Sequence, residues 1–163
     1  MIQPKVTRPK FPKGYVDSPT SEVTWSYVQD RLANSKNYWL ASISPDQKPH
    51  VIPRWGVWVN NKFYYDGSPE TRHAKNLQLN AQVTLHLENG DQAVILNGFS
   101  NPTGKPNSDL AEQIAAAYRL KYTEFGYAPE ASQWDEGGLY VFTPQTALAW
   151  TIFFENPTKF IFE

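Results

Sequence analysis

Short strand-like segments joined by tight turns are the feature that most restricts the fold of this chain. Aromatic and aliphatic residues gather in these segments, and the stretches between them carry the proline, asparagine and glycine that are typical of turns. Asn60–Asn61, for example, tolerates the positive φ angles of a tight hairpin turn. Because strands joined by such short links run antiparallel, we expect a mainly β fold whose antiparallel sheet can close into a barrel. The expected strands span residues 38–44, 50–59, 63–66, 83–88, 93–99, 139–142, 146–154 and 159–162.

Helical segments and an extended arm accompany the expected strands. Apolar residues repeat at helical spacing after Thr20, and either Ser18 or Thr20 is placed to cap this first helix. Two further helices are expected at residues 70–80 and 109–124. Residues 1–19 contain four prolines and several lysines, so we expect an extended arm that is ordered only where it lies on the rest of the protein. Residues 20–163 show no internal boundary and are expected to form a single domain.

Composition excludes several classes of function. The chain has 163 residues and a net charge of −1, so it has no overall basic field to attract nucleic acid or an anionic membrane. It has no cysteine, which removes disulfides and thiol catalysis and is consistent with a reducing compartment. No segment reaches the ~20 apolar residues that cross a membrane, and the N-terminus lacks the apolar run of a signal peptide. We therefore expect a cytoplasmic protein without nucleic-acid or membrane partners.

Positively charged residues follow the third expected strand, at the start of the second helix. Arg72, His73 and Lys75 stand there, with Ser68 and Thr71 just before them. An arginine offers a planar fork for two phosphate oxygens, a lysine offers a point charge, and the first turn of a helix adds backbone N–H donors. Cations at a helix N-terminus oppose the helix dipole, and a bound anion would remove that cost. The simpler interpretation is a solvated basic turn, and the alternative that we predict is a phosphate site.

Several motifs in a fixed order give the chain a family resemblance. They are the hairpin WLAS…PDQKPHVIPRWGVW, the strand-to-helix step FYYDGS…TRHAKNL, the LNG that ends the fifth strand, and the C-terminal AWTIFFENPTKFIFE. Over about residues 23–162, this pattern resembles the pyridoxamine 5′-phosphate oxidase-like FMN-binding split-barrel superfamily, in its branch of small flavin- and deazaflavin-dependent oxidoreductases. The resemblance implies a six- to seven-stranded antiparallel split β-barrel with flanking helices. It also implies a homodimer with two flavin sites at the subunit interface.

The resemblance further implies which residues contact the cofactor, FMN. The second strand is expected to lie along the flavin ring, and the cationic residues of the second helix are expected to bind its phosphate. Trp150 and Lys159, in the closing hairpin, are expected to come from the partner subunit. The implied cofactor contacts are His50, Val51, Ile52, Pro53, Arg54, Trp55, Ser68, Thr71, Arg72, His73, Lys75, Gln92, Trp150 and Lys159.

Some of these residues depart from the family pattern or have a simpler explanation. Trp55 stands where some relatives carry a lysine, and Lys159 replaces an arginine of the closing motif. From the residues alone, His50 and Arg54 either meet a cofactor anion or reach solvent. Trp150 is as well explained by core packing, and a glutamine in a turn, such as Gln92, is usually just solvated.

The sequence leaves the reaction open. It shows no nucleophile–base pair, no glycine-rich phosphate loop and no metal-ligand spacing of histidines, so we assign no catalytic residue and no metal site. This fits an FMN-dependent oxidoreductase that moves hydride or electrons between a nicotinamide or other reductant and a small organic substrate. The alternatives are a deazaflavin-dependent reductase, a non-enzymatic flavin- or haem-binding protein with His50, His73 or His86 as haem ligand, and a structural dimer with an empty barrel. Oxidation of pyridoxamine phosphate itself is not expected, because no second cationic cluster supplies a second phosphate site.

Overall fold

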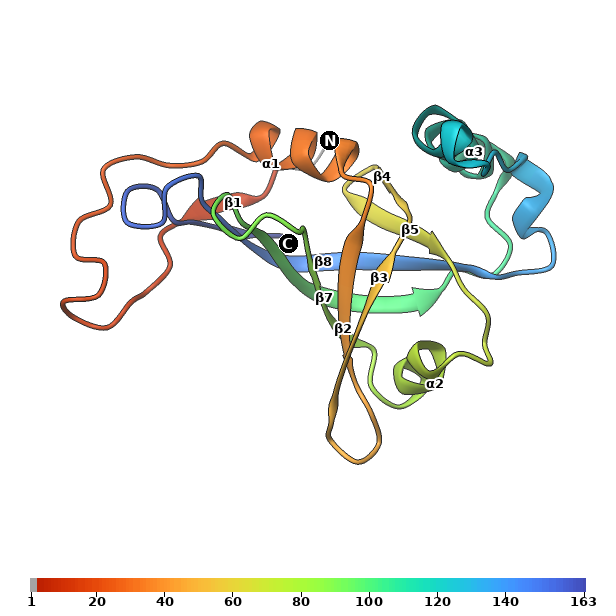
Figure 1. The fold of residues 1–163 in the computed structure, drawn as a ribbon, viewed down its shortest axis with the longest axis horizontal. Coiled ribbons are helices and arrows are strands. Elements are labelled where there is room, and N and C mark those ends of the chain that lie inside the picture. Colours follow the sequence, from red (N-terminus) through yellow and green to blue (C-terminus); the bar gives the residue numbers. More distant parts are fainter. Residues whose placement is uncertain (1–2) are drawn as a thin grey trace.

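A computed structural model describes residues 3–163 and shows, within them, one antiparallel sheet with flanking helices (Figure 1). Met1 and Ile2, the first residues of the expected arm, lie outside the described residues. The strands are β1 (Lys5–Thr7), β2 (Tyr38–Ile43), β3 (Pro49–Arg54), β4 (Val57–Val59), β5 (Lys62–Asp66), β6 (Gln82–His86), β7 (Val94–Pro102), β8 (Leu139–Ala149) and β9 (Thr158–Ile161). The helices are α1 (Trp25–Asn34), α2 (Arg72–Leu79) and α3 (Ser108–Tyr122), and the short 3-10 helices are η1 (Thr123–Phe125) and η2 (Ala131–Trp134).

The long strand β8 organises the sheet. The strand order is β1-β9-β8-β7-β6-β2-β3, with β4 paired to β5 and β5 paired to β8. One edge of β8 pairs with β7, whereas its other edge pairs first with β5, at residues 139–142, and then with β9, at residues 146–149. Pro144 stands between these two stretches, and proline has no N–H to donate to a ladder. Sharing one edge between two partners splits the barrel.

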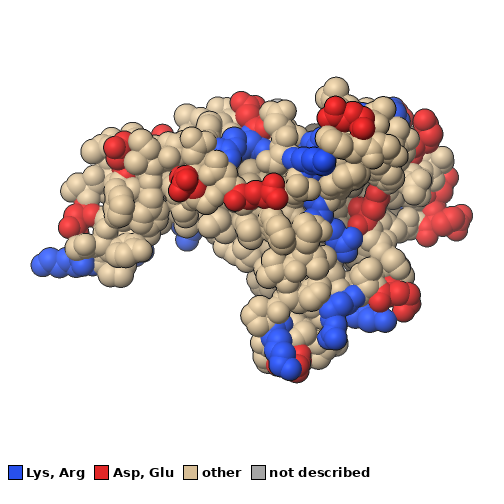
Figure 2. All heavy atoms as spheres, viewed as in Figure 1, with Lys and Arg blue, Asp and Glu red and all other residues tan. Residues whose placement is uncertain are grey.

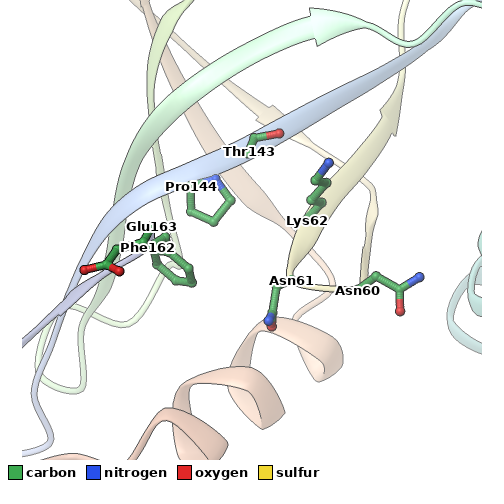
Figure 3. A pocket seen from close by; sticks show the side chains of 7 residues that line it. All are labelled: Asn60, Asn61, Lys62, Thr143, Pro144, Phe162 and Glu163. Atoms are coloured by element: carbon green, nitrogen blue, oxygen red, sulfur yellow. The ribbon is translucent and has the colours of Figure 1, made fainter. Parts of the chain in front are cut away.

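A hollow of about 300 Å³ marks the place where β8 changes partner (Figure 3). Its lining residues are Asn60, Asn61, Lys62, Thr143, Pro144, Phe162 and Glu163. None of the residues that the sequence predicts as cofactor contacts lines this hollow. It is therefore a feature of the split rather than of the predicted site.

The barrel is also open at β3. This strand is the last in the sheet order and pairs with β2 alone within the described part of the chain. It leads directly into β4 through Trp55 and Gly56, yet no ladder among the described residues joins it to β4 or β5. Figure 1 shows α2 and the β2–β3 turn on one side of the sheet, and α1 and α3 on the other.

Two apolar clusters hold the elements together. The larger fills the barrel with fully buried rings such as Tyr38, Phe63 and Phe142, and α1 covers one end of it through Val28 and Leu32. The smaller lies under α3, and its members include Tyr64, Ile114, Tyr118, Tyr122 and Trp134. Burial of these rings supplies the main driving force for folding. No helix in the described part of the chain is long and apolar enough to span a lipid bilayer.

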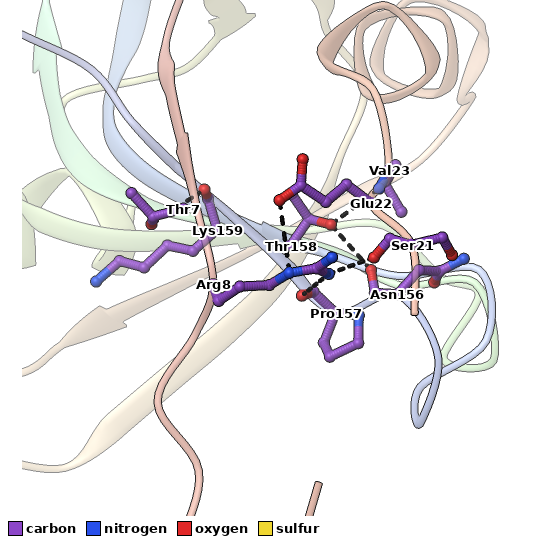
Figure 4. A network of polar contacts seen from close by, with 9 residues as sticks. All are labelled: Thr7, Arg8, Ser21, Glu22, Val23, Asn156, Pro157, Thr158 and Lys159. Atoms are coloured by element: carbon purple, nitrogen blue, oxygen red, sulfur yellow. Dashed lines mark hydrogen bonds and ion pairs between the residues drawn. The ribbon is translucent and has the colours of Figure 1, made fainter. Parts of the chain in front are cut away.

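The arm that precedes α1 is held against β9. β1 pairs with β9, and Thr7 Oγ1 donates to the backbone oxygen of Lys159 at 3.4 Å. Arg8 lies 3.5 Å from the Glu22 carboxylate and also donates to the backbone oxygens of Ser21 and Pro157 (Figure 4). The arm is thus ordered where it adds a strand to the sheet.

The split-barrel fold expected from the sequence is confirmed, with differences of detail. The described residues form nine strands rather than six or seven, since the arm contributes β1 and the segment 50–59 breaks at Gly56 into β3 and β4. The segments expected at 139–142 and 146–154 join into one continuous strand, β8, which ends at Ala149, so residues 150–154 are not strand. The first helix is capped by Thr24, not by Ser18 or Thr20, because the Thr20 N–H donates to the backbone oxygen of Glu155 at 2.8 Å and keeps this stretch extended.

Candidate functional site

The turn between β5 and α2 fixes the start of the second helix. Thr71 is the N-cap, and its side chain accepts a hydrogen bond from the Ala74 N–H at 3.2 Å. The same hydroxyl donates to the backbone oxygen of Ser68 at 2.9 Å, and Ser68 Oγ accepts from the Glu70 N–H at 3.3 Å. Ser68 and Thr71, both expected as cofactor contacts, therefore already shape the turn that presents the helix.

Two of the three expected phosphate-binding cations line a cavity of about 560 Å³ between α2 and the β2–β3 turn. Figure 2 shows basic side chains gathered over this part of the surface. Lys75 pairs with Glu70 at 3.1 Å, so part of its charge is already balanced. Arg72 is exposed and forms no ion pair among the residues that the structure describes. Lys48, and to a smaller extent Arg72, lower the pKa of the nearby Asp46 carboxyl.

The third residue of the predicted cluster, His73, points the other way. It is only 2% exposed, and its Nε2 lies 2.7 Å from the hydroxyl of Tyr65 on β5. That hydroxyl also lies 2.6 Å from Oγ of Ser100 on β7, which is fully buried. Burial, followed by the charges of Arg54 and His50, lowers the pKa of His73 to about 4, so the ring is neutral at physiological pH. The expected cluster is thus divided between the two faces of α2.

The strand β3 presents its side chains alternately to the barrel and to the outside. His50, Ile52 and Arg54 pair with inward-facing residues of β2 and are half-buried. Val51 and Pro53 are exposed on the outer face. The carbon at the centre of the Arg54 guanidinium lies 5.7 Å from the centroid of the Tyr65 ring, and its Nη1 donates to the Asp66 backbone oxygen at 3.5 Å.

Buried polar atoms without partners concentrate between β3 and α2. Among the described residues, His50 Nδ1, Arg54 Nε, His73 Nδ1 and Asn76 Oδ1 are buried and make no hydrogen bond. Asn76, on the same helix as His73, donates to Ser42 Oγ at 3.1 Å, and Ser42 is the register partner of His50. Each buried group left unpaired costs about 1–3 kcal/mol. Such a concentration fits a place where a polar ligand or water supplies the missing partners.

Next to this polar region, Trp55 leaves β3 on the opposite side from Arg54. Its ring stacks on Tyr122 of α3, with centroids 4.8 Å apart and planes 16° apart, and it is 36% exposed. The Lys36 ammonium lies 5.6 Å from the Trp55 ring and 3.3 Å from that of Phe125. Trp55 therefore joins the end of β3 to α3.

A half-buried lysine completes the junction between β3 and α3. Lys121 Nζ donates to the Tyr38 hydroxyl at 2.6 Å, to the Ser35 backbone oxygen at 3.0 Å and to the Gly56 backbone oxygen at 3.2 Å. Burial lowers its pKa to about 7. These bonds fix the backbone where β3 passes into β4.

Three of the residues expected to contact the cofactor lie in other parts of the fold. Gln92 accepts from Arg31 Nη1 at 3.1 Å and from the Tyr27 hydroxyl at 3.4 Å, next to α1. The Trp150 N–H donates to the backbone oxygen of Ala93 at 3.2 Å. Lys159 lies on β9, opposite Thr7. A single chain therefore does not bring these three side chains to the region between β3 and α2, since β9 and β3 stand at opposite ends of the run β9-β8-β7-β6-β2-β3 in the sheet.

Other residues of the region escaped the sequence analysis. Tyr65, Ser100 and Ser42 are separated along the chain and carry no local signal that they meet. Asn76 follows His73 by three positions, so helical spacing does place it on the same side of α2. The described residues hold no group of three or more His, Cys, Asp or Glu side chains that could bind a metal ion.

The divided β8 edge, the open strand β3 and the polar region beside α2 define the class to which this fold belongs. It is a split β-barrel, the fold that the sequence resemblance implied. No protein-family model matches the chain, and no curated protein matches it either.

Solved structures similar to this chain are named for different cofactors. HutZ, the haem storage protein from Vibrio cholerae, is 20% identical with a TM-score of 0.56, over 77% of this chain and 93% of that one. An F420 reductase is 16% identical with a TM-score of 0.52, over 84% and 98%. A FAD-binding protein from Mesorhizobium loti is 13% identical with a TM-score of 0.60, over 86% and 96%. At these identities the likeness concerns the fold alone.

Proposed function

We propose that this protein binds FMN between β3 and α2 and is a flavin-dependent oxidoreductase acting on a small organic substrate, with a nicotinamide as a candidate reductant. The observation that carries the proposal is the concentration of unpaired buried polar atoms on His50, Arg54, His73 and Asn76. These atoms lie beside a cavity whose charged lining residues are Arg72, Lys75 and Glu70. A flavin nucleotide has both a phosphate and a polar ring edge to supply the missing partners. When bound, the flavin supplies the hydride or electron transfer, and the chain supplies binding, orientation and charge.

The two faces of α2 have separate roles in this proposal. Arg72 and Lys75 attract the phosphate from solvent, and His73 and Arg54 meet its oxygens from the barrel side. The open strand β3 offers unpaired backbone groups to the ring edge, because it has no second neighbour in the described sheet. Trp55, stacked on Tyr122, bounds the substrate side.

A homodimer is part of the proposal. On the outer face of the sheet, a single row of register partners crosses six strands. Pro53 is exposed and the other five are partly exposed: Trp39, His86, Ile95, Leu148 and Lys159. A second copy packed on this partly apolar row would cover it. The second copy would also carry Gln92, Trp150 and Lys159 to a site that they do not reach within one chain.

An absorption spectrum of the purified protein, with mass analysis of whatever heat releases, tests the cofactor. Bands of a free flavin together with the mass of FMN would support the proposal, and turnover with a nicotinamide and a defined acceptor would support the oxidoreductase. A single deazaflavin-like band would assign the rival cofactor, in line with the similar reductase. A colourless protein that fails to take up added FMN would refute the proposal of an FMN-dependent oxidoreductase.

The phosphate assignment has its own test. In Arg72→Ala with Lys75→Ala we expect FMN affinity to fall roughly 30-fold or more, since charge-assisted hydrogen bonds contribute about 1.5–3 kcal/mol each and Lys75 is shared with Glu70. Riboflavin, which lacks the phosphate, should bind the variant and the wild type alike. Lys13→Ala with Lys105→Ala removes the same charge elsewhere and is the control. Unchanged FMN affinity in the first variant would contradict the assignment.

Haem binding is a second candidate, and it rests on His86. Its Nδ1 lies 2.9 Å from the Leu87 backbone oxygen, and because a carbonyl only accepts, Nδ1 carries the hydrogen and Nε2 keeps its lone pair. A histidine held in this way is typical of iron and zinc ligands. If haem is the cofactor, added haemin should give a Soret band that His86→Ala removes and His50→Ala retains.

A further inference from the structure

We propose that His73 is held by Tyr65 and Ser100 as the tautomer with its hydrogen on Nδ1, so that it offers a bound ligand one hydrogen-bond donor and no lone pair for a metal. The ligand class that follows is an anion rich in acceptors. The inference rests on the proposed function only for the identity of that anion, the phosphate of FMN. The tautomer itself is a property of the chain without ligand.

The argument begins with a count of hydrogens in the buried chain from Ser100 to His73. Ser100 Oγ and His73 Nε2 both lie within hydrogen-bond distance of the same Tyr65 hydroxyl, at 2.6 and 2.7 Å. That hydroxyl has one hydrogen to donate. While the imidazole is neutral, the three groups can be ordered in three ways. In one of them both Ser100 and His73 donate to Tyr65, which leaves the Tyr65 hydrogen and the Nδ1 lone pair unpaired. The other two orders use the Tyr65 hydrogen.

In the first order, Ser100 donates to Tyr65, and Tyr65 donates to Nε2 of His73. Both hydroxyl hydrogens are then used, and the hydrogen of the imidazole stands on Nδ1. In the second order, Nε2 donates to Tyr65, and Tyr65 donates to Ser100. The hydrogen of Ser100 then has no partner among the described residues, at a side chain with no exposed surface, and the lone pair on Nδ1 is unpaired as well.

The first order is preferred because it leaves fewer buried groups unpaired. Among these three groups the first order leaves only the Nδ1–H without a partner, whereas each of the other orders leaves both a hydroxyl hydrogen and the Nδ1 lone pair unpaired. A neutral ring is expected because burial and the charges of Arg54 and His50 disfavour the imidazolium. Even a charged ring would keep a hydrogen on Nδ1, so the donor is present in either state.

A second buried N–H donor without a partner belongs to the same region as the Nδ1–H of His73. Arg54 Nε is also a buried N–H without a partner in the described part of the chain, and the Arg54 charge is near enough to act on His73. Two unpaired donors and a positive charge in one region favour a ligand that brings acceptors and negative charge. A haem iron needs a free imidazole lone pair, and His73 has none to offer, because Nε2 already accepts from Tyr65.

The tautomer is measured by long-range proton–nitrogen correlation spectra of the protein labelled with ¹⁵N-histidine, at pH 7 and without ligand. The His73 signals are assigned by their loss in His73→Asn. A protonated Nδ1 with an unprotonated Nε2 is expected. A protonated Nε2 with an unprotonated Nδ1 would overturn the inference, whatever cofactor the protein binds.

The ligand class is measured by titrating FMN and riboflavin into matched variants. His73→Ala should weaken FMN about 10- to 100-fold, as expected for a hydrogen bond to a charged group, and leave riboflavin unchanged. His73→Asn, whose amide N–H stands close to the place of Nδ1–H, should restore FMN affinity to within a few-fold of the wild type. Equal FMN affinity in the alanine variant and the wild type would overturn the assignment of the anion. If the wild type fails to bind FMN, the proposed function fails while the spectra still decide the tautomer.

Discussion

Removal of one buried hydroxyl tests how far the polar chain beside α2 stabilises the fold. Tyr65→Phe keeps the ring, which stacks on Tyr140 at 5.5 Å and packs near Phe63 at 5.6 Å, and deletes only the oxygen between His73 and Ser100. Both partners are buried, so neither gains water in exchange. The change therefore isolates the hydrogen bonds from the packing.

The expected loss follows from the two groups left unpaired. At about 1–3 kcal/mol for each, the range for the pair is roughly 2–6 kcal/mol. We expect the lower half, about 2–4 kcal/mol, because the groups left unpaired are neutral and the upper values belong to charged groups. For a chain of this size, that corresponds to a fall in Tm of about 4–16 °C.

Urea unfolding of four variants measures how much the hydrogen bonds of the Tyr65 hydroxyl contribute to the free energy of unfolding. Tyr65→Phe, Ser100→Ala and their double variant form a cycle in which the double variant should be more stable than the sum of the single losses, by about 0.5–3 kcal/mol. Tyr140→Phe is the control, because no hydrogen bond of its hydroxyl is found in the described part of the chain, and it should change stability by less than about 0.5 kcal/mol. A loss in Tyr65→Phe no larger than in this control, or strict additivity in the cycle, would refute the reasoning.

Three further predictions concern the junction with α3 and the outer face. Gly56→Ala should destabilise by more than about 1–3 kcal/mol in denaturant unfolding, because a Cβ there would lie 2.3 Å from the Phe63 ring, whereas Gly90→Ala meets nothing within 4 Å and should be nearly neutral. The Lys121 ammonium loses its proton near pH 10.5 in the unfolded chain and near pH 7 in the folded chain, so its contribution to the free energy of unfolding should rise with pH between these values. Lys121→Met should remove this rise in unfolding experiments at several pH values. An unchanged slope in the variant would contradict the burial of the amine. Light scattering should find a dimer for the wild type and a monomer for Ile95→Arg, with Leu120→Arg, 91% exposed on α3, remaining dimeric; a monomeric flavin-loaded wild type would exclude the proposed pairing.

Local patterns were enough to predict most of the framework. The alternation in β3 places Arg54 and Trp55 on opposite sides in both the expectation and the structure. The step from β5 into α2 also follows from nearby residues, since Thr71 caps the helix through a bond three positions away. Elements of this kind depend on contacts within a few residues, and the sequence displays those directly.

Contacts between distant segments could not be predicted in the same way. The sequence treats Arg72, His73 and Lys75 as one cationic group, but the barrel draws His73 inward because Tyr65 and Ser100, 35 positions apart, meet beneath it. The cap of α1 is displaced by a backbone bond between Thr20 and Glu155. In each case a contact with a residue far along the chain outweighs the local sequence preference, and the local pattern does not indicate which residue that is.

The pairing of β1 with β9 has a consequence for synthesis on the ribosome. Thr7 and Lys159, which face each other across this ladder, are 152 positions apart. At about 5–20 residues per second, the arm emerges roughly 8–30 s before its partner strand exists. During that interval Arg8 and the strand-forming residues 5–7 have no β9 edge to join, so the nascent chain carries an unpaired strand until β9 has been synthesised. The β1–β9 ladder, which covers the β9 edge against pairing with other chains, therefore forms only after β9 has been synthesised.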